Sequence, residues 1–324
     1  MSKIISFIKN WTLPIAIALG IAAYYIYTAI PFLDNTHAFV ANIIAVIQPV
    51  LIFFMLFLTF CKIKLSELRL TKWHLWLLLI QSVTYVAGII VCTEINSIVQ
   101  KILIESFILC TICPTATAAA VITSKLGGNP ATLTTYTILI NLVVAIIVPI
   151  FTPLLHPVAG QSFMNSFWLI ICKVFPMLFL PFLLAITLRK INKKITEWFA
   201  SFHNLAFYLW AVSLSLAIGV TVKAIVHTHS SLTLMLLIAI SSAMACVIQF
   251  SLGRIIGVRN KDKISATQSL GQKNTVFAIW MGYTFMSPVT SIAGGFYSVW
   301  HNIFNSWQLY QKQHSKTAKS TTKT

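Results

Sequence analysis

Residues 265–275 read SATQSLGQKNT, a polar run in the middle of an apolar block at residues 262–286. The run contains Lys273, and an ionisable group at the centre of a bilayer costs about 2.5–3.5 kcal/mol on insertion scales. It also contains Gly271, which weakens a helix. We therefore favour a functional role for this run over a purely structural one.

The block around this run is one of ten apolar blocks in a chain of 324 residues. The chain is 58% hydrophobic and only 9% charged, whereas a soluble domain carries about 25% charged residues. Each block is near the length of about 20 residues that spans a bilayer, and most lack the alternation of a barrel strand. We therefore expect an all-α membrane protein with ten transmembrane helices. The blocks are residues 12–32, 38–61, 73–93, 99–124, 130–153, 164–189, 202–226, 231–256, 262–286 and 288–309.

The positive charges fall on one side of this topology. If the N-terminus is cytoplasmic, most of the 23 Lys and Arg residues lie in cytoplasmic segments, which is the positive-inside pattern. This distribution argues against nucleic acid as the partner, although the net charge is +17. It predicts that both termini are cytoplasmic. The residues concerned are Lys3, Lys9, Lys62, Lys64, Arg69, Lys72, Lys125, Arg189, Lys190, Lys193, Lys194, Arg254, Arg259, Lys261, Lys263, Lys312, Lys316, Lys319 and Lys323.

The fourth helix is interrupted as well as the ninth. Residues 110–119 read CTICPTATAA, and Pro114 removes a backbone donor and clashes with the preceding turn. The small and hydroxyl residues around it allow another backbone to approach closely. One broken helix in each half of five helices indicates two halves of opposite orientation, because five is odd. This arrangement is typical of a transporter with a binding site near the midplane.

The chain is expected to form a single membrane transporter domain, residues 1–324. The two inverted five-helix repeats occupy residues 11–153 and 164–310, and residues 311–324 form a basic cytoplasmic tail that is too short and too rich in Thr and Ser to fold. We expect an integral protein of a bacterial plasma membrane. The longest polar connections are residues 62–72 and 189–201.

Several segments resemble the bile acid:sodium symporter family. The Cys-Pro at residues 113–114 and the Gly-Asn at residues 128–129 resemble the break in that family's fourth helix. Residues 267–274, the Ser-Pro at residues 287–288 and GFYSVWHNI at residues 295–303 resemble its ninth and tenth helices. The order and spacing of all ten blocks also agree with the family.

The resemblance implies an architecture and an activity. Helices one, two, six and seven would form a panel, and helices three to five and eight to ten a core in which the broken helices cross. Organic anions would bind in the crevice between panel and core, sodium would bind behind the crossing, and rocking would give alternating access. The N–H groups at the broken ends favour anions. The residues expected to line the crevice are Thr115, Thr117, Thr267, Gln268, Asn274 and Thr275.

Compared with the family, this chain has lost sodium ligands on helices four and five. Ala119 and Ala120 stand where the family has a Ser-Asn pair, and Leu133 stands where it has a Ser. Thr137 on helix five and Gln81 on helix three match retained ligands.

The ninth helix departs from the family in the same direction. Ser269 replaces a Glu and Lys273 replaces a Gln, while Asn274 is kept. Sodium requires several hard oxygen ligands, and an ammonium would repel it. We hypothesise that Lys273 is a built-in substitute for sodium, which makes sodium coupling unlikely. Alternatively, proton coupling is possible because burial disfavours a charged lysine, or Lys273 only braces the crossing.

Other polar residues in the blocks receive simpler interpretations. Glu105 is expected to pair with Lys101 one turn away. Lys173 on helix six either faces the crevice or pairs with Glu94 or Glu105. His301 is expected to make a hydrogen bond in helix packing rather than to relay protons.

The sequence therefore predicts a secondary transporter for a small organic anion, such as a bile acid or another carboxylate. Besides this substrate and the lipid bilayer, no obligate protein partner is evident. We expect no enzymatic activity, catalytic residue, metal or cofactor. A monovalent cation/proton antiporter is a second possibility, although no Asp or Glu lies near the ninth-helix break. A receptor on a transporter scaffold is a third.

Overall fold

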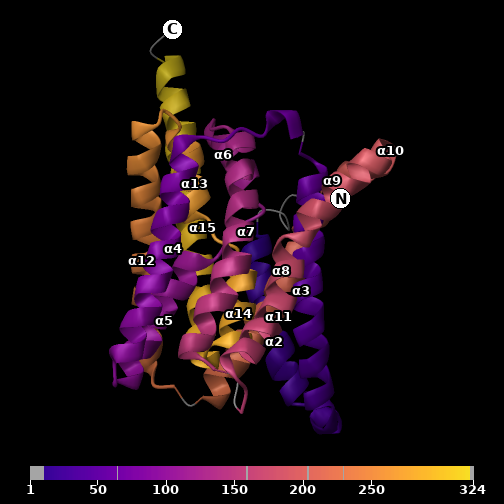
Figure 1. Ribbon diagram of the computed structural model, residues 1–324, viewed down its shortest axis with the longest axis vertical. Coiled ribbons are helices and arrows are strands. Elements are labelled where there is room, and N and C mark those ends of the chain that lie inside the picture. Colours follow the sequence, from indigo (N-terminus) through magenta and orange to yellow (C-terminus); the bar gives the residue numbers. More distant parts are fainter. Residues whose placement is uncertain (1–10, 64, 158–159, 203, 229, 322–324) are drawn as a thin grey trace.

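The computed structural model describes residues 11–63, 65–157, 160–202, 204–228 and 230–321, and Figure 1 shows that they form a bundle of helices. Within these residues the structure has no strand, only one isolated β-bridge between Thr115 and Lys273. Lys3, Lys9, Lys64 and Lys323 of the charge pattern lie outside the described residues.

The predicted blocks each coincide with one helix or with two consecutive helices. The blocks that are split in two are the fourth, the sixth and the ninth, which contain the α5–α6, α8–α9 and α13–α14 pairs. The helices are α2 (Thr12–Thr28), α3 (His37–Cys61), α4 (Lys72–Glu94), α5 (Ile98–Ile112), α6 (Ala119–Leu126), α7 (Pro130–Leu155), α8 (Phe163–Leu178), α9 (Leu180–Ile191), α10 (Lys193–Ser201), α11 (Leu205–His227), α12 (Leu232–Arg259), α13 (Lys263–Gly271), α14 (Thr275–Phe285) and α15 (Pro288–Thr321), with the short 3-10 helices η1 (Pro31–Thr36) and η2 (Leu65–Glu67).

Among the described residues, five helical segments are long and apolar enough to cross a membrane, and a sixth is the α8–α9 pair, which bends by 43°. The five are Pro31–Cys61 and the helices α4, α7, α11 and α12. The two broken helices fall short because each half is too short, and α2 has only 17 residues. Because these helices are long and apolar enough to cross a bilayer, the chain is an integral membrane protein.

The helices divide into two groups by their contacts. The first group consists of α2, α3, α8, α9 and α11, where α11 packs on α2 and α3, and α3 packs on α8 and α9. The second group contains α4 to α7 and α12 to α15, and α12 lies against α5, α13 and α15. The two groups meet where α7 packs on α8 and where α11 packs on α14 and α15.

The closest packing in the second group is built on glycine. Gly253 and Gly257 lie one turn apart on α12, in the GxxxG spacing that lets membrane helices approach closely. A Cβ at Gly253 would lie 2.7 Å from the Ala266 carbonyl oxygen and 2.9 Å from the Thr267 Cα. The small residues of α12 thus hold α13, and with it the polar run, against the bundle.

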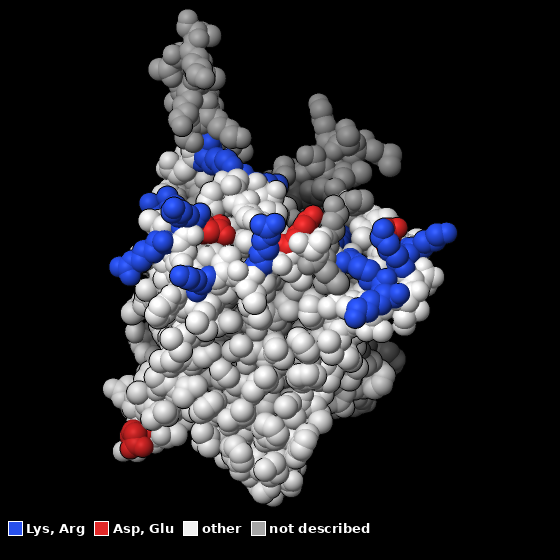
Figure 2. All heavy atoms as spheres, turned by 45° about the horizontal axis from the view of Figure 1, so that its top comes forward, with Lys and Arg blue, Asp and Glu red and all other residues white. Residues whose placement is uncertain are grey.

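The lysines and arginines gather over one end of the bundle. Figure 2 shows them as a rim around this end, with very few charges on the rest of the visible surface. The rim includes exposed side chains of the first residue of α4, of α10 and of the last turns of α12, such as Lys72, Lys193, Lys194, Arg254 and Arg259. In Figure 1 the same end carries α6 and α10.

Two polar segments are more helical than the sequence indicates. The connection at residues 189–201 forms the end of α9 and then α10, because the Asn192 side chain accepts hydrogen bonds from the first amides of α10 and Phe199 packs on Phe57. The expected unfolded tail is helical to Thr321. Extending an existing helix does not require the costly nucleation step.

We expect Gly253→Ala to lower the thermal stability of the purified protein. The added methyl group has only backbone atoms to displace, and overpacking of this kind costs about 1–3 kcal/mol. Gly219→Ala in α11 is the matched control, because its Cβ would meet only an ordinary contact at 3.5 Å. Thermal unfolding in detergent measures both; equal midpoints for the two variants would contradict the packing account.

Candidate transport site at the crossing of two broken helices

Two interrupted helices meet in the second group. In the first, α5 ends at Ile112 and α6 begins at Ala119; in the second, α13 ends at Gly271 and α14 begins at Thr275. Pro114 lies in the first interruption, where the sequence predicts the break. Four helix ends therefore come together at one place.

The two interruptions pair with each other through their backbones. The amide of Ala116 donates to the carbonyl of Gln272 at 3.0 Å, and the amide of Asn274 donates to the carbonyl of Pro114 at 2.8 Å. This antiparallel bridge places Thr115 opposite Lys273. Each broken helix thus supplies partners for backbone groups that the other leaves free.

A glutamine and a tyrosine provide hydrogen bonds at the C-terminal end of α5. The Gln81 amide on α4 donates to the carbonyl oxygens of Ile112 at 2.9 Å and Cys113 at 3.1 Å. The Tyr136 hydroxyl on α7 donates to the Gln81 side-chain oxygen at 2.8 Å. Gln81 and Tyr136 are both fully buried, so the carbonyls of Ile112 and Cys113 have a donor within the protein.

The end of α13 has a similar pair from the other flanking helices. The Tyr297 hydroxyl on α15 donates to the carbonyl of Gly271 at 2.8 Å. The Gln249 amide on α12 lies 3.1 Å from this hydroxyl and donates to the carbonyl of Cys110 at 3.3 Å. Nothing in the sequence singles out Gln249 or Tyr136, because single polar atoms in long apolar helices carry no pattern, and Tyr297 stands out only within the string at residues 295–303.

Lys273 is buried at the centre of the crossing. Its side chain is 1% exposed, and its ammonium nitrogen has no hydrogen-bond partner among the described residues. Its backbone amide donates to Nδ1 of His301 at 3.4 Å, so His301 makes the packing hydrogen bond expected from the sequence.

The residues predicted to bind substrate come together around this crossing. Thr115, Thr267, Gln268, Asn274 and Thr275 are buried, and Thr117 is half-buried. Several of these polar groups have partners within the protein: Thr115 donates to the Ser269 carbonyl at 2.7 Å, and the Asn274 side chain accepts from the first turn of α14. Their role in substrate binding stays a prediction.

The positions equivalent to the sodium site of the resembling family offer few side-chain oxygens. Ala119 and Leu133 are buried and apolar, and Ala120 is half-buried. The hydroxyl of Thr137 donates to the carbonyl of Leu133 at 3.1 Å, and the buried hydroxyl of Ser269 has no partner in the described part of the chain. Of the hard oxygen ligands that sodium requires, these five positions supply two hydroxyls and no carboxylate. Gln81 adds an amide oxygen, which already accepts a hydrogen bond from Tyr136.

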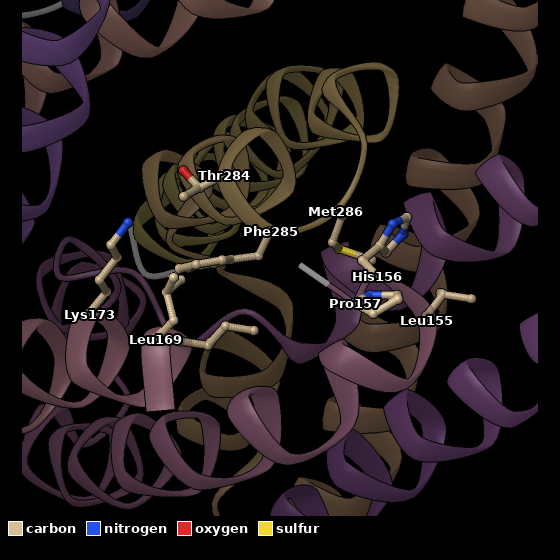
Figure 3. Close-up of a pocket in the computed structure, with 9 residues that line it drawn as sticks. Leu155, His156, Pro157, Leu169, Lys173, Thr284, Phe285 and Met286 are labelled. Carbon is tan, nitrogen blue, oxygen red and sulfur yellow. The ribbon is translucent and has the colours of Figure 1, made fainter. Parts of the chain in front are cut away.

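A cavity lies between the last residues of α7, the middle of α8 and the last residues of α14. Its volume is about 420 Å³, and Lys173 and His156 line it together with Phe285 (Figure 3). The Lys173 ammonium lies 5.8 Å from the centre of the Phe285 ring. The sequence left open whether Lys173 faces the crevice or pairs with Glu94 or Glu105. In the structure it faces the space between the two helix groups. The other lining residues are Leu155, Pro157, Leu169, Ile170, Thr284 and Met286.

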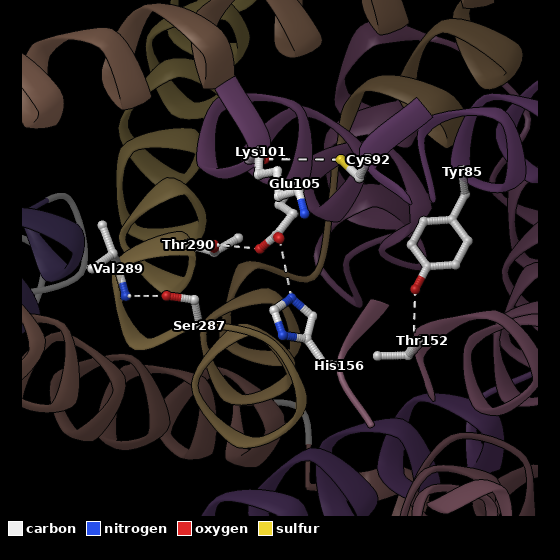
Figure 4. Close-up of polar contacts among 9 residues, drawn as sticks. All are labelled: Tyr85, Cys92, Lys101, Glu105, Thr152, His156, Ser287, Val289 and Thr290. Atoms are coloured by element: carbon white, nitrogen blue, oxygen red, sulfur yellow. Dashed lines mark hydrogen bonds and ion pairs between the residues drawn. The ribbon is translucent and has the colours of Figure 1, made fainter. Parts of the chain in front are cut away.

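Glu105 pairs with His156 beside this cavity. Its carboxylate lies 3.1 Å from Nε2 of His156 and accepts a hydrogen bond from the Thr290 hydroxyl at 2.9 Å (Figure 4). The prediction that Glu105 forms an ion pair with Lys101 is wrong. The Glu105 side chain is buried, so its partners come from the neighbouring helices of the bundle. No sequence pattern marks His156, which lies three residues beyond the end of the apolar block at residues 130–153.

These features define a class of protein. Two broken helices that cross within a bundle of apolar membrane helices are typical of secondary transporters. The chain belongs to the SBF-like CPA transporter family, because the model of that family matches residues 12–311, which is nearly the whole chain. The resemblance to the bile acid:sodium symporter family is thereby confirmed. No curated protein matches the sequence.

We expect Gln81→Leu to destabilise the protein, because it leaves the carbonyls of Ile112 and Cys113 without their donor. Each unsatisfied buried group costs about 1–3 kcal/mol. Thr137→Val is the control, since its hydroxyl only returns to its own helix. Thermal unfolding in detergent should show a lower midpoint for Gln81→Leu alone. Similar midpoints would mean that these carbonyls do not depend on Gln81.

Proposed function

We propose that this transporter moves a small organic anion by alternating access and that Lys273 takes the place of a coupling sodium ion. The observation that carries the proposal is the buried ammonium at the crossing, which has no carboxylate partner among the described residues. Buried charges in membrane proteins are rare and mark transport pathways. A lysine at the place where a related carrier holds its cation is therefore a functional group.

The arrangement of the helices supports ten membrane crossings in two inverted halves. The first group of helices corresponds to the expected panel, and the second to the expected core. A glutamine and a tyrosine lie beside each break: Gln81 and Tyr136, from the third and fifth predicted helices, at the end of α5, and Gln249 and Tyr297, from the eighth and tenth, near the end of α13. The same two residue types on corresponding helices are what an inverted repeat would produce.

The electrostatics of the crossing support an anion as substrate. The carbonyl ends of α5 and α13 carry partial negative charge, which favours a cation between them. Lys273 supplies this charge permanently in the protonated state. The N-terminal ends of α6 and α14 carry partial positive charge and favour an anionic group of the substrate. The residues proposed to contact this anionic group are the six predicted from the sequence: Thr115, Thr117, Thr267, Gln268, Asn274 and Thr275.

The ligand set at the crossing argues against sodium. Ala119, Ala120 and Leu133 offer no side-chain oxygen, and Ser269 offers a hydroxyl where a carboxylate would be the strongest ligand. We infer that transport does not require sodium. A carrier with a constantly charged Lys273 would be a facilitator or exchanger, whereas one in which Lys273 loses its proton during the cycle would couple to protons.

Two other functions receive less support. A monovalent cation/proton antiporter would need a carboxylate for its cation at the crossing, whereas the buried carboxylate of Glu105 is already paired with His156 and Thr290. A receptor would bind the anion without moving it. We place the protein in a bacterial plasma membrane with both termini cytoplasmic, since the basic rim then faces the cytoplasm.

Uptake of organic anions into proteoliposomes tests the proposal. We expect uptake to proceed equally with sodium and with potassium as the external cation. Lys273→Gln should lower the rate at least tenfold, because it removes the only charge that substitutes for the ion. Lys223→Gln, which changes the net charge equally on α11, should leave the rate unchanged.

Three outcomes would count against parts of this account. A strict requirement for sodium would show that the crossing still holds the ion. An unchanged rate and pH dependence in Lys273→Gln would show that Lys273 only braces the structure. Binding of an anion by the wild-type protein without any flux would indicate a receptor.

A further inference from the structure

Helix α10 begins where a membrane span ends. The α8–α9 pair forms the bent span, and only Asn192 separates its last residue, Ile191, from Lys193 at the start of α10. The backbone of Asn192 is extended, with φ −147° and ψ 96°, and turns the chain. Figure 1 shows α10 extending outward from the bundle at the end that carries the basic rim. A helix in this position lies at the level of the lipid headgroups.

One side of α10 attaches it to the bundle. Thr196 is buried and Phe199 is half-buried. The Phe199 ring packs on Phe57 of α3, with the ring centres 5.0 Å apart. The helix contacts α9 and α3, which both belong to the first helix group. This attachment leaves the other sides of α10 facing the surroundings of the protein.

A second side of α10 is apolar and exposed. Ile195 and Trp198 are three residues apart and so share a face, and their side chains are 41% and 57% exposed. Phe202 extends this surface, because its ring centre lies 4.7 Å from that of Trp198. Such a surface is unfavourable in water, whereas tryptophan is typical of the interface between membrane and water. The apolar side therefore fits the boundary between headgroups and acyl chains.

The remaining surface of α10 is basic. Lys193 pairs with Glu197 at 3.4 Å. Lys194 and Lys190, in the last turn of α9, are exposed and form no ion pair with any described residue. Three lysines against one carboxylate leave an excess of two positive charges next to the apolar side. Basic clusters at this level of a membrane protein attract anionic headgroups.

We propose that α10 is an interfacial helix that binds an anionic phospholipid in the leaflet at the basic rim. The acyl chains contact Ile195 and Trp198, and the phosphate lies on Lys190 and Lys194. An apolar side next to a basic side is the pattern of helices that lie in the membrane interface. Lysine suits this position, because its methylene stem covers apolar surface while its ammonium stays with the headgroups.

The lipid site lies on the first helix group alone, because α10 contacts α9 and α3. It is therefore separate from the crossing of the broken helices, which belongs to the second group. The inference requires only that the chain spans a membrane and does not rest on the proposed function. Failure of the lipid site would leave anion transport untouched, and failure of transport would leave the lipid site untouched.

Calorimetric titration of the purified full chain in an uncharged detergent tests the headgroup preference. The probes are dihexanoyl phosphatidylglycerol and dihexanoyl phosphatidylcholine, which differ in net charge. We expect phosphatidylglycerol to bind about tenfold more tightly, because the lysines attract its negative charge. Glu197→Gln should tighten this binding about twofold, since it releases Lys193 from its ion pair.

Two triple variants show whether the binding belongs to α10 or to the basic rim as a whole. The first combines Lys190→Gln, Lys193→Gln and Lys194→Gln, and should weaken phosphatidylglycerol binding about tenfold. Arg at the same three positions should retain binding within about threefold, which excludes misfolding as the cause of the loss. The matched control removes the same charge elsewhere on the rim and should bind like the wild type; it combines Arg254→Gln, Arg259→Gln and Lys263→Gln.

Nitroxide labels show which side of α10 lies in lipid. Of the six cysteines only Cys172 is exposed, so Cys172→Ala provides the background for single labels at Ile195→Cys and Glu197→Cys. In nanodiscs that contain phosphatidylglycerol, the label at position 195 should collide mainly with oxygen, which concentrates in lipid. The label at position 197 should collide mainly with a water-soluble nickel complex.

The proposal is overturned if phosphatidylglycerol binds no better than phosphatidylcholine, or if the variant with Gln at the three lysines of α9 and α10 binds like the wild type. An equal loss in the control variant would assign the binding to the rim in general and would also overturn it. Equal access of the nickel complex to both labels would place α10 in water. A label at position 195 that neither reagent reaches, in a protein that forms dimers, would show that a second copy covers this surface instead of lipid.

Discussion

The pairing of two unwound backbone segments is the interaction on which the rest of this structure depends. In a bilayer, every free amide and carbonyl must find a partner within the protein. The breaks at Pro114 and at residues 272–274 release such groups at the same depth, and they satisfy each other across the crossing. Neither broken helix would be tolerated without the other, so the two breaks form one structural unit.

This unit explains why so many polar side chains are buried around it. Gln81 and Tyr136 satisfy the carbonyl end of α5, and Tyr297 satisfies that of α13. The carbonyl ends also create a region of negative potential within the bundle. A charged group is then favoured there, either an ion or the ammonium of Lys273. An ion can leave with each cycle, whereas a lysine stays and can exchange only its proton.

The sequence predicted the helical class, the two breaks and the family, because these depend on long apolar blocks and on Pro and Gly, which act locally. It also located Lys273, since one charge in an apolar block is conspicuous. The sequence did not predict which residues on other helices the buried polar side chains contact. Glu105 was expected to pair along its own helix, yet it binds His156 and Thr290 from α7's end and α15. Contacts between helices depend on rotation about their axes, which hydropathy does not encode.

The location of Lys173 bears on the alternating access that we propose. It belongs to the group of α2, α3, α8, α9 and α11, whereas Phe285 and His156 belong to the other group. A ligand between them contacts both groups, so its binding free energy depends on their separation. A ligand shifts an equilibrium only by its differential affinity for the two states. A ligand that contacts both Lys173 and Phe285 would therefore favour the conformation that brings them together.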